Sequence, residues 1–177
     1  EAALVAALEG PGVRFADVGD LAKAFASGRG HHAEYAVSAA LHAAIEPLTA
    51  TARLSGDRLE IWMPTQAPDL ARAAAARAVG LAPDGVTIFP MLAGGGYGRH
   101  LEVEAAEQAA ILARHMRRPV QLTWSRAEEC IQDRFRPPAR ARLTATLGEN
   151  GVIAGWQAKI ATPSTWGPTL ARLKGGA

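Results

Sequence analysis

The sequence has very little of what builds disulfides, thiolate metal clusters or basic tracts. Cys130 is the only cysteine, which excludes a disulfide within the chain and a thiolate cluster supplied by this chain alone. Lys23, Lys159 and Lys174 are the only lysines, and the arginines are spread along the sequence. Aromatic residues make up 6% of the sequence and do not interleave with a basic run, so we expect no nucleic-acid binding. No apolar run approaches the length that spans a membrane.

The composition is that of a globular protein with a core of its own. The 177 residues are 49% apolar and 20% charged, and the formal net charge is +2. A chain of this length can bury a sizeable core. It begins at Glu1 rather than Met, and the apolar run at 2–8 already predicts a helix. We therefore expect the chain to be a segment of a longer protein.

Residues 1–33 are expected to form an N-terminal arm or linker that packs against partner surfaces. A helix is predicted over residues 1–9, where the glycine and proline that follow stop it. The alternation of apolar and polar residues at Val13–Val18 predicts a strand. Asp20 is a candidate N-cap for a second helix that runs through Phe25.

Residues 34–163 are expected to form one domain, and residues 164–177 a truncated tail. Runs rich in β-formers predict strands, and alanines at helical spacing predict helices. The ranges are a hairpin at 49–54 and 58–63, a helix at 68–79, a strand at 86–92, a helix at 103–116, a strand at 120–124, a short helix at 126–131 and a hairpin at 139–147 and 152–161. This order predicts a two-layer α+β fold with helices packed on a mixed β-sheet.

The most distinctive stretch is the glycine-rich loop at 92–100, between the strand at 86–92 and the helix at 103–116. Its four glycines permit positive φ angles and a close approach of another group to the main chain. Free N–H groups in such a turn can bind an anionic or oxygen-rich ligand. Arg99 stands where a dinucleotide fingerprint needs its third glycine, and no Lys-Ser/Thr pair follows as in a P-loop. A flexible connector is the alternative reading of the loop.

Other polar residues give weaker signals. Gln66 lies between a strand and a helix, where a side-chain amide either donates to an oxygen ligand or serves as a surface or capping residue. Neighbouring histidines such as His31 and His32 point to opposite faces of a strand, which argues against a metal site. His42 with Glu46, and His100 with Glu104, are spaced at i, i+4, but two ligands do not make a site.

Three further interpretations concern packing and charge. Cys130 is interpreted as a small core residue beside Ile131. Trp62 and Trp124, at strand ends, are interpreted as packing residues rather than a base-stacking platform. Four arginines alternate along an apparent strand and form either one basic face or a solvated outer face: Arg134, Arg136, Arg140 and Arg142.

Several motifs taken together resemble those of a known enzyme family. These are His42-Ala43-Ala44-Ile45-Glu46-Pro47, Pro64-Thr65-Gln66-Ala67-Pro68, Gly94-Gly95-Gly96-Tyr97-Gly98-Arg99 and the stretch from Arg118 to Arg126 with Phe135-Arg136-Pro137 after it. In this order and spacing they resemble the large molybdenum-binding subunit of the xanthine dehydrogenase/aldehyde oxidase family. The most similar branch is that of the isoquinoline 1-oxidoreductase beta subunit. The resemblance covers residues 34–163.

The resemblance implies roles for particular residues. Gln66 matches the glutamine that donates a hydrogen bond to an oxygen ligand of molybdenum. The loop residues Gly95, Gly96, Tyr97 and Gly98 match those whose main chain lies against the molybdopterin cofactor, with Tyr97 in place of the usual Phe. Leu101 stands in the substrate pocket where purine-oxidising relatives carry a glutamate, which favours an aldehyde or an N-heteroaromatic substrate. The family's catalytic glutamate has no match here, so the resemblance implies no catalytic residue in this chain.

The resemblance also implies cofactors and partners. The family hydroxylates or oxidises its substrate with oxygen from water, and the pterin dithiolene holds molybdenum, so no protein metal ligand is expected. Electrons leave through iron–sulfur clusters, usually on a small partner subunit. The chain is then part of a molybdenum-dependent oxidoreductase, inactive alone, with the small 2Fe–2S subunit and the rest of the large subunit as partners. The alternative is a non-catalytic structural module derived from this scaffold. Exposed apolar surface predicts self-association of the isolated chain.

Overall fold

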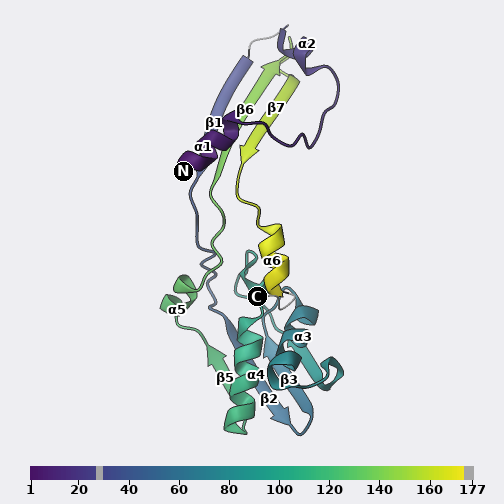
Figure 1. Cartoon of the computed structure of the whole chain (residues 1–177), viewed down its shortest axis with the longest axis vertical. Coiled ribbons are helices and arrows are strands. Elements are labelled where there is room, and N and C mark those ends of the chain that lie inside the picture. Colours follow the sequence, from purple (N-terminus) through teal and green to yellow (C-terminus); the bar gives the residue numbers. More distant parts are fainter. Residues whose placement is uncertain (27–29, 174–177) are drawn as a thin grey trace. The chain divides into compact units, whose positions relative to one another are not determined.

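A computed structural model describes residues 1–26 and 30–173. They form two compact units (Figure 1). The hairpin unit combines Glu1–Ala40 with Arg136–Ser164, and the core unit combines Leu41–Phe135 with the described part of Thr165–Ala177. Within the described ranges no helix is both long and apolar enough to cross a membrane.

The core unit is built on a four-stranded mixed sheet. Its strands are β2 (Thr49–Ser55), β3 (Arg58–Met63), β4 (Val86–Pro90) and β5 (Val120–Thr123), in the order β4-β3-β2-β5. The β2–β3 hairpin turns at Gly56, whose φ of +60° suits glycine. The β3–β4 pair is parallel and the other pairs are antiparallel. The hairpin and both following strands were predicted, and the structure confirms them.

Two long helices pack on this sheet, α3 (Pro68–Val79) and α4 (Glu104–Met116). Pro68 stands in the first turn of α3, and Gly80 ends the helix in the left-handed conformation with φ of +65°. Both helices were predicted within a residue of their observed bounds. The structure therefore confirms the two-layer α+β fold with helices on a mixed sheet.

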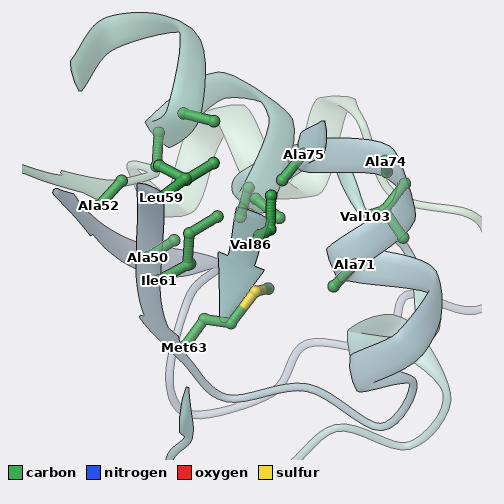
Figure 2. Close-up of a cluster of buried hydrophobic side chains, with 14 of the residues drawn as sticks. Ala50, Ala52, Leu59, Ile61, Met63, Ala71, Ala74, Ala75, Val86 and Val103 are labelled. Atoms are coloured by element: carbon green, nitrogen blue, oxygen red, sulfur yellow. The ribbon is translucent and has the colours of Figure 1, made fainter. Parts of the chain in front are cut away.

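The core between sheet and helices is lined largely by alanine on the helix side (Figure 2). The sheet contributes Leu59, Ile61 and Met63, which are buried almost completely. The buried alanines of the helices are Ala71, Ala74, Ala75, Ala76, Ala105, Ala106, Ala109, Ala110 and Ala113. Because alanine is small, the helix backbones lie close to the sheet, and the larger sheet residues fill the space between the layers.

The core unit also contains two shorter helices, α5 (Arg126–Ile131) and α6 (Trp166–Leu173). Ser125 caps α5, because its hydroxyl accepts a hydrogen bond from the Glu128 N–H. Helix α6 was not predicted, since its residues fall in the expected tail. Arg172 on α6 donates to Glu102 at 2.7 Å, which ties this helix to the segment before α4.

The hairpin unit is an antiparallel sheet of β1 (Gly30–Val37), β6 (Ala139–Leu147) and β7 (Ile153–Ala161), in the order β1-β6-β7. Helices α1 (Ala2–Glu9) and α2 (Leu21–Ala26) contact β6 and β7. Both helices and the β6–β7 hairpin were predicted. Asp20 caps α2 as expected by accepting a hydrogen bond from the Lys23 N–H at 2.9 Å.

The predicted strand at Val13–Val18 is wrong. This segment has no regular structure, and the side chains of Val13, Phe15 and Val18 are more than nine-tenths exposed. Alternation of apolar and polar residues makes a strand only where a neighbouring strand supplies hydrogen bonds and a buried face, and among the described residues no strand pairs with it.

Of the two interpretations of the arginine run, the structure excludes the basic face, and the run does not lie on a single strand. Only Arg140 and Arg142 lie on β6, whereas Arg134 and Arg136 precede the strand. Arg142 donates to Glu34 at 2.7 Å and to Glu9 at 2.6 Å, and Arg140 pairs with Glu1. These acidic partners neutralise the two arginines of β6, which therefore do not form a cationic face.

The division into an arm at 1–33, a domain at 34–163 and a tail at 164–177 stays a prediction for the intact protein. Within this chain, residues of the expected arm pack with residues of the expected domain. Strand β1 pairs with β6 along its whole length, and helices α1 and α2 contact the same sheet. The pairing joins residues more than a hundred positions apart in sequence, such as Tyr35 and Ala141.

Candidate functional site

The glycine-rich loop and Gln66 meet because they follow two adjacent parallel strands. Strand β3 ends at Met63 and leads to Gln66, while β4 ends at Pro90 and leads to the loop. The Met91 N–H still donates to the Met63 carbonyl at 2.9 Å, which extends the pairing past the strand ends. Ligands of open α/β sheets bind at the carboxyl ends of parallel strands. The fold thus brings Gln66 and the loop together despite their separation in sequence.

Gln66 is held by the loop at two points. Its main-chain N–H donates to the His100 carbonyl at 2.9 Å, and its side-chain Oε1 accepts from the Gly98 N–H at 3.2 Å. With the carbonyl oxygen so engaged, the side-chain NH₂ group has no partner among the described residues. Gln66 therefore presents a donor beside the loop, rather than capping the helix that follows it.

The loop is a defined turn whose glycines are required by its geometry. Gly95, Tyr97 and Gly98 have φ angles of +96°, +55° and +102°. A Cβ atom on Gly96 would lie 2.9 Å from Oε1 of Gln66, and one on Gly94 would lie 2.6 Å from Cβ of Glu46. Two of the glycines thus allow close packing against side chains and two allow left-handed backbone. These contacts favour a fixed turn over a flexible connector.

Glu46 holds the first glycine of the loop. Its Oε2 accepts from the Gly94 N–H at 2.8 Å, and its own N–H donates to the Gly94 carbonyl at 3.2 Å. The i, i+4 spacing of His42 and Glu46 does not place them on one helix face, because residues 41–48 form no helix. Sequence reasoning singled out this segment by the spacing of His42 and Glu46 and by resemblance, but the separation in sequence hid its contact with the loop.

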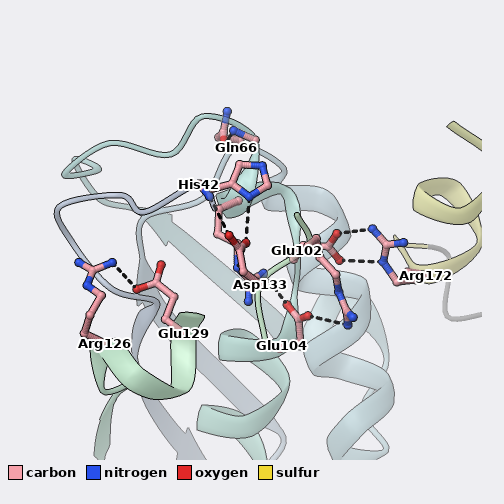
Figure 3. Close-up of polar contacts among 11 residues, drawn as sticks. His42, Gln66, Glu102, Glu104, Arg126, Glu129, Asp133 and Arg172 are labelled. Atoms are coloured by element: carbon pink, nitrogen blue, oxygen red, sulfur yellow. Dashed lines mark hydrogen bonds and ion pairs between the residues drawn. The ribbon is translucent and has the colours of Figure 1, made fainter. Parts of the chain in front are cut away.

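His42 lies under the other end of the loop and is bound by Asp133 (Figure 3). Oδ2 of Asp133 accepts from the His42 main-chain N–H at 2.7 Å, and Oδ1 lies 2.9 Å from the ring Nδ1. Burial raises the pKa of Asp133, but these hydrogen bonds from His42 outweigh it and hold the pKa below its ordinary value. Asp133 is therefore a carboxylate, and Nδ1 of His42 carries the proton that it donates.

Arg99, which follows the last glycine of the loop, is completely buried among compensating groups. Its Nε lies 3.4 Å from Oδ1 of Asp133, and its Nη1 lies 3.5 Å from Oε2 of Glu104. The guanidinium also stands over the ring of Trp124, 5.6 Å from the centroid. A buried cation needs such partners to offset the loss of hydration. The Asp133 carboxylate thus contacts both side chains: it holds the ring of His42 and compensates the charge of Arg99.

His100 is buried beside Arg99, and neither ring nitrogen has a hydrogen-bond partner among the described residues. Burial lowers the pKa of His100, and the charge of Glu46 offsets this only in part. The i, i+4 partner considered for it, Glu104, instead binds Arg99 and Arg134. Within the described residues no group of three or more His, Cys, Asp or Glu is placed to hold a metal ion.

Leu101 and Tyr97 lie on either side of Gly98. Leu101 ends the short 3₁₀ turn Arg99–Leu101 and its N–H donates to the Gly98 carbonyl at 3.2 Å. The Tyr97 side chain is largely exposed, and its ring edge lies against Gly95, where a Cβ would be 3.2 Å away. The structure thus brings together Gln66, Gly95, Gly96, Tyr97, Gly98 and Leu101.

Of the packing interpretations, that of the tryptophans is confirmed and that of Cys130 is wrong. Trp124 is buried and donates to Gln108 at 2.8 Å, and Trp62 stacks on Phe89 with 5.0 Å between ring centroids. Cys130 is only partly buried and its neighbour Ile131 is exposed. The short helix α5 turns Glu129 inward instead, where Arg126 binds it.

Comparison with known proteins identifies relatives along nearly the whole chain. The family model described as the molybdopterin cofactor-binding domain matches residues 8–172. One nicotinate dehydrogenase subunit from Pseudomonas putida is 31% identical over 137 residues, which cover 77% of this chain and 12% of that protein. The beta subunit of isoquinoline 1-oxidoreductase from Brevundimonas diminuta is 35% identical over 108 residues, covering 60% of this chain and 14% of that protein.

The fold matches a solved enzyme as well. The aldehyde oxidoreductase of Desulfovibrio gigas superposes with a TM-score of 0.65 at 22% identity, covering 81% of this chain and 16% of that one. At this identity the likeness shows the fold alone. The chain spans only a small part, 12% to 16%, of the length of these relatives.

Proposed function

The chain belongs to the family of molybdopterin cofactor-binding domains, and from that premise we propose that it forms part of the cofactor cradle of a molybdenum hydroxylase. The intact enzyme would oxidise an aldehyde or an N-heteroaromatic compound with oxygen from water. The observation that carries the proposal is the hydrogen bond from the Gly98 N–H to Oε1 of Gln66. It fixes the loop and the Gln66 amide as one surface.

The residues present fit a pterin cofactor rich in hydrogen-bond acceptors. Among the described residues, the main-chain N–H groups of Gly95, Gly96 and Tyr97 have no partner, and they are consecutive. Successive free N–H groups in left-handed turns form concave sites for anionic or oxygen-rich ligands. The Gln66 amide adds a side-chain donor at the same place. The small glycines let a flat ligand approach these donors closely.

In this assignment the chain binds and orients the cofactor and carries no catalytic base. When bound, the molybdenum–pterin group supplies the redox chemistry, and its own dithiolene holds the metal. Gln66 donates to an oxygen of the cofactor from a position set by Gly98 and His100. A general base on another part of the protein would take the proton.

Leu101 favours a substrate that does not require a hydrogen bond to a carboxylate of the protein at this position. It supplies an apolar side chain one turn beyond Tyr97, where the resemblance places a glutamate in purine-oxidising relatives. Aldehydes and N-heteroaromatic rings present apolar surface that such a side chain contacts. The relatives that the chain matches are named as subunits, so they act in assemblies. We infer a small iron–sulfur subunit and the remainder of the large subunit as partners.

The test removes the Gln66 amide in the intact protein that carries this sequence, produced with its partner subunits. Gln66→Ala is expected to lower both molybdenum content and turnover, since it deletes a donor to the cofactor. Gln121→Ala, an exposed glutamine on β5, is the matched control and should leave both unchanged. Unchanged molybdenum and turnover in Gln66→Ala would exclude the role assigned to Gln66. A folded wild-type protein without molybdenum would instead favour the non-catalytic scaffold.

A further inference from the structure

His42 is a second side chain placed to contact the ligand of the loop. Its ring is nine-tenths buried, and Nε2 has no hydrogen-bond partner among the described residues. Nε2 is not one of the fully buried atoms without a partner, so it is the part of this ring that remains open to a ligand.

The orientation of the ring is fixed from below. Asp133 binds both the main-chain N–H and the ring Nδ1 of His42, so the ring can neither slide nor rotate freely. Because Nδ1–H donates to the carboxylate, the free nitrogen is Nε2. Carboxylates fix the tautomer and direction of metal-binding histidines in the same way. Here the arrangement leaves Nε2 as the nitrogen available to a ligand.

Nε2 lies at the same point of the loop as the Gln66 amide. A Cβ built on Gly98 would be 3.6 Å from Nε2, so the ring lies beside the face of this glycine that carries no side chain. The Gly98 N–H is bound by Gln66, whose amide nitrogen has no partner among the described residues. In Figure 3 the His42 ring lies above the Asp133 carboxylate, toward Gln66. Two unpartnered side-chain groups thus flank one glycine of the cradle.

We propose that Nε2 of His42 hydrogen-bonds to a polar group of the bound pterin cofactor, beside Gly98. The inference rests on the proposed function of the loop and adds a contact to it. Asp133 acts as the positioning residue. The Arg99 guanidinium also pairs with the Asp133 carboxylate, with 3.4 Å between Nε and Oδ1. Neither Asp133 nor Arg99 touches the ligand in this arrangement.

Two substitutions separate the ring nitrogens of His42. His42→Asn keeps a donor near the position of Nδ1 for Asp133 and removes Nε2. His42→Gln carries an amide to the position of Nε2 and gives up the bond to Asp133. His115→Asn, an exposed histidine of α4, is the matched control. The readouts are the rate at which molybdenum leaves the purified, diluted intact protein and the melting temperature of its cofactor-free form.

We expect His42→Asn to release molybdenum about five to ten times faster than wild type, the effect of one lost hydrogen bond of about 1 to 1.4 kcal/mol. Its cofactor-free melting temperature should stay that of wild type. His42→Gln should release molybdenum at nearly the wild-type rate, and His115→Asn at the wild-type rate.

Three results would overturn the assignment. Wild-type release from His42→Asn would show that Nε2 does not hold the cofactor. Fast release from both variants together with lower melting temperatures would show that His42 only supports the fold. A wild-type protein that never contains molybdenum would contradict the proposed function and this inference together. If the wild-type protein does contain molybdenum, the two variants test the role of His42 alone.

Discussion

Gly96→Ala is the most direct perturbation of the loop, because the added methyl group meets Gln66. The new Cβ would lie 2.9 Å from Oε1 and 3.3 Å from Cδ of Gln66, closer than carbon and oxygen atoms tolerate. Gly96 does not have a positive φ, so the substitution brings no backbone strain of that kind. Gln66 has a flexible side chain and turns away, which breaks its bond with Gly98. The main chain of the loop itself has no reason to move.

The magnitude follows from the bonds lost. The hydrogen bond between Gln66 and Gly98 contributes about 0.5 to 1.5 kcal/mol to stability. Its loss lowers the melting temperature of a domain of this size by about 2–4 °C per kcal/mol. Misplacing the Gln66 amide loses a further bond of about 1 to 1.4 kcal/mol to the cofactor, so affinity for it falls about five- to tenfold.

The assay pairs molybdenum content at limiting cofactor supply with thermal unfolding of the cofactor-free protein. Gly148→Ala is the control, since its Cβ meets other atoms only at 3.7 Å and beyond, in the hairpin unit. We expect Gly96→Ala to lose most of its molybdenum with a small loss of stability, and Gly148→Ala to change neither. If Gly96→Ala binds molybdenum as wild type does, the loop and Gln66 do not form one binding surface.

Two predictions concern the cofactor-free core unit. Ile61→Ala removes a completely buried side chain between sheet and helices and should cost about 2–5 kcal/mol; denaturant unfolding measures this, and a loss below about 1 kcal/mol would contradict the close packing of the core. His100→Leu should flatten the pH dependence of stability. Burial lowers the folded-state pKa of His100, so the unfolded chain binds more protons, and wild-type stability falls as pH drops below about 6.5. Melting curves of the two proteins between pH 5 and pH 8 that stay parallel would refute that reading.

Local signals were enough to predict most elements. Pro68 and Gly80 mark the two ends of α3, and Gly56 marks the β2–β3 turn; each acts through its own backbone preference, so sequence neighbours suffice. Helix α6 was missed because Gly167 and Pro168 suggest a loop. Proline is nevertheless tolerated in a first turn, and the start of α6 offers such a place.

The supports of the candidate site could not be predicted by the same means. Glu46, His42 and Asp133 act through contacts with residues 48 to 91 positions away. No local pattern encodes such contacts; only the folded sheet brings the three segments together. Gln66 is the intermediate case: its place between a strand and a helix was read from the sequence, but only the parallel pairing of β3 and β4 places it at the loop. The assignment of Gln66 and the loop residues to the cofactor stays a prediction.

The two-way bonding of Glu46 with Gly94 has a consequence for motion. The Glu46 N–H binds the Gly94 carbonyl, and the Gly94 N–H binds the Glu46 carboxylate. The segment before β2 and the loop after β4 therefore cannot move apart without breaking both bonds. Amide hydrogens of the two stretches should accordingly exchange with solvent at matched rates, as one cooperative opening rather than two. A ligand that slows exchange at the glycines would then also slow it around Glu46, although it touches nothing there.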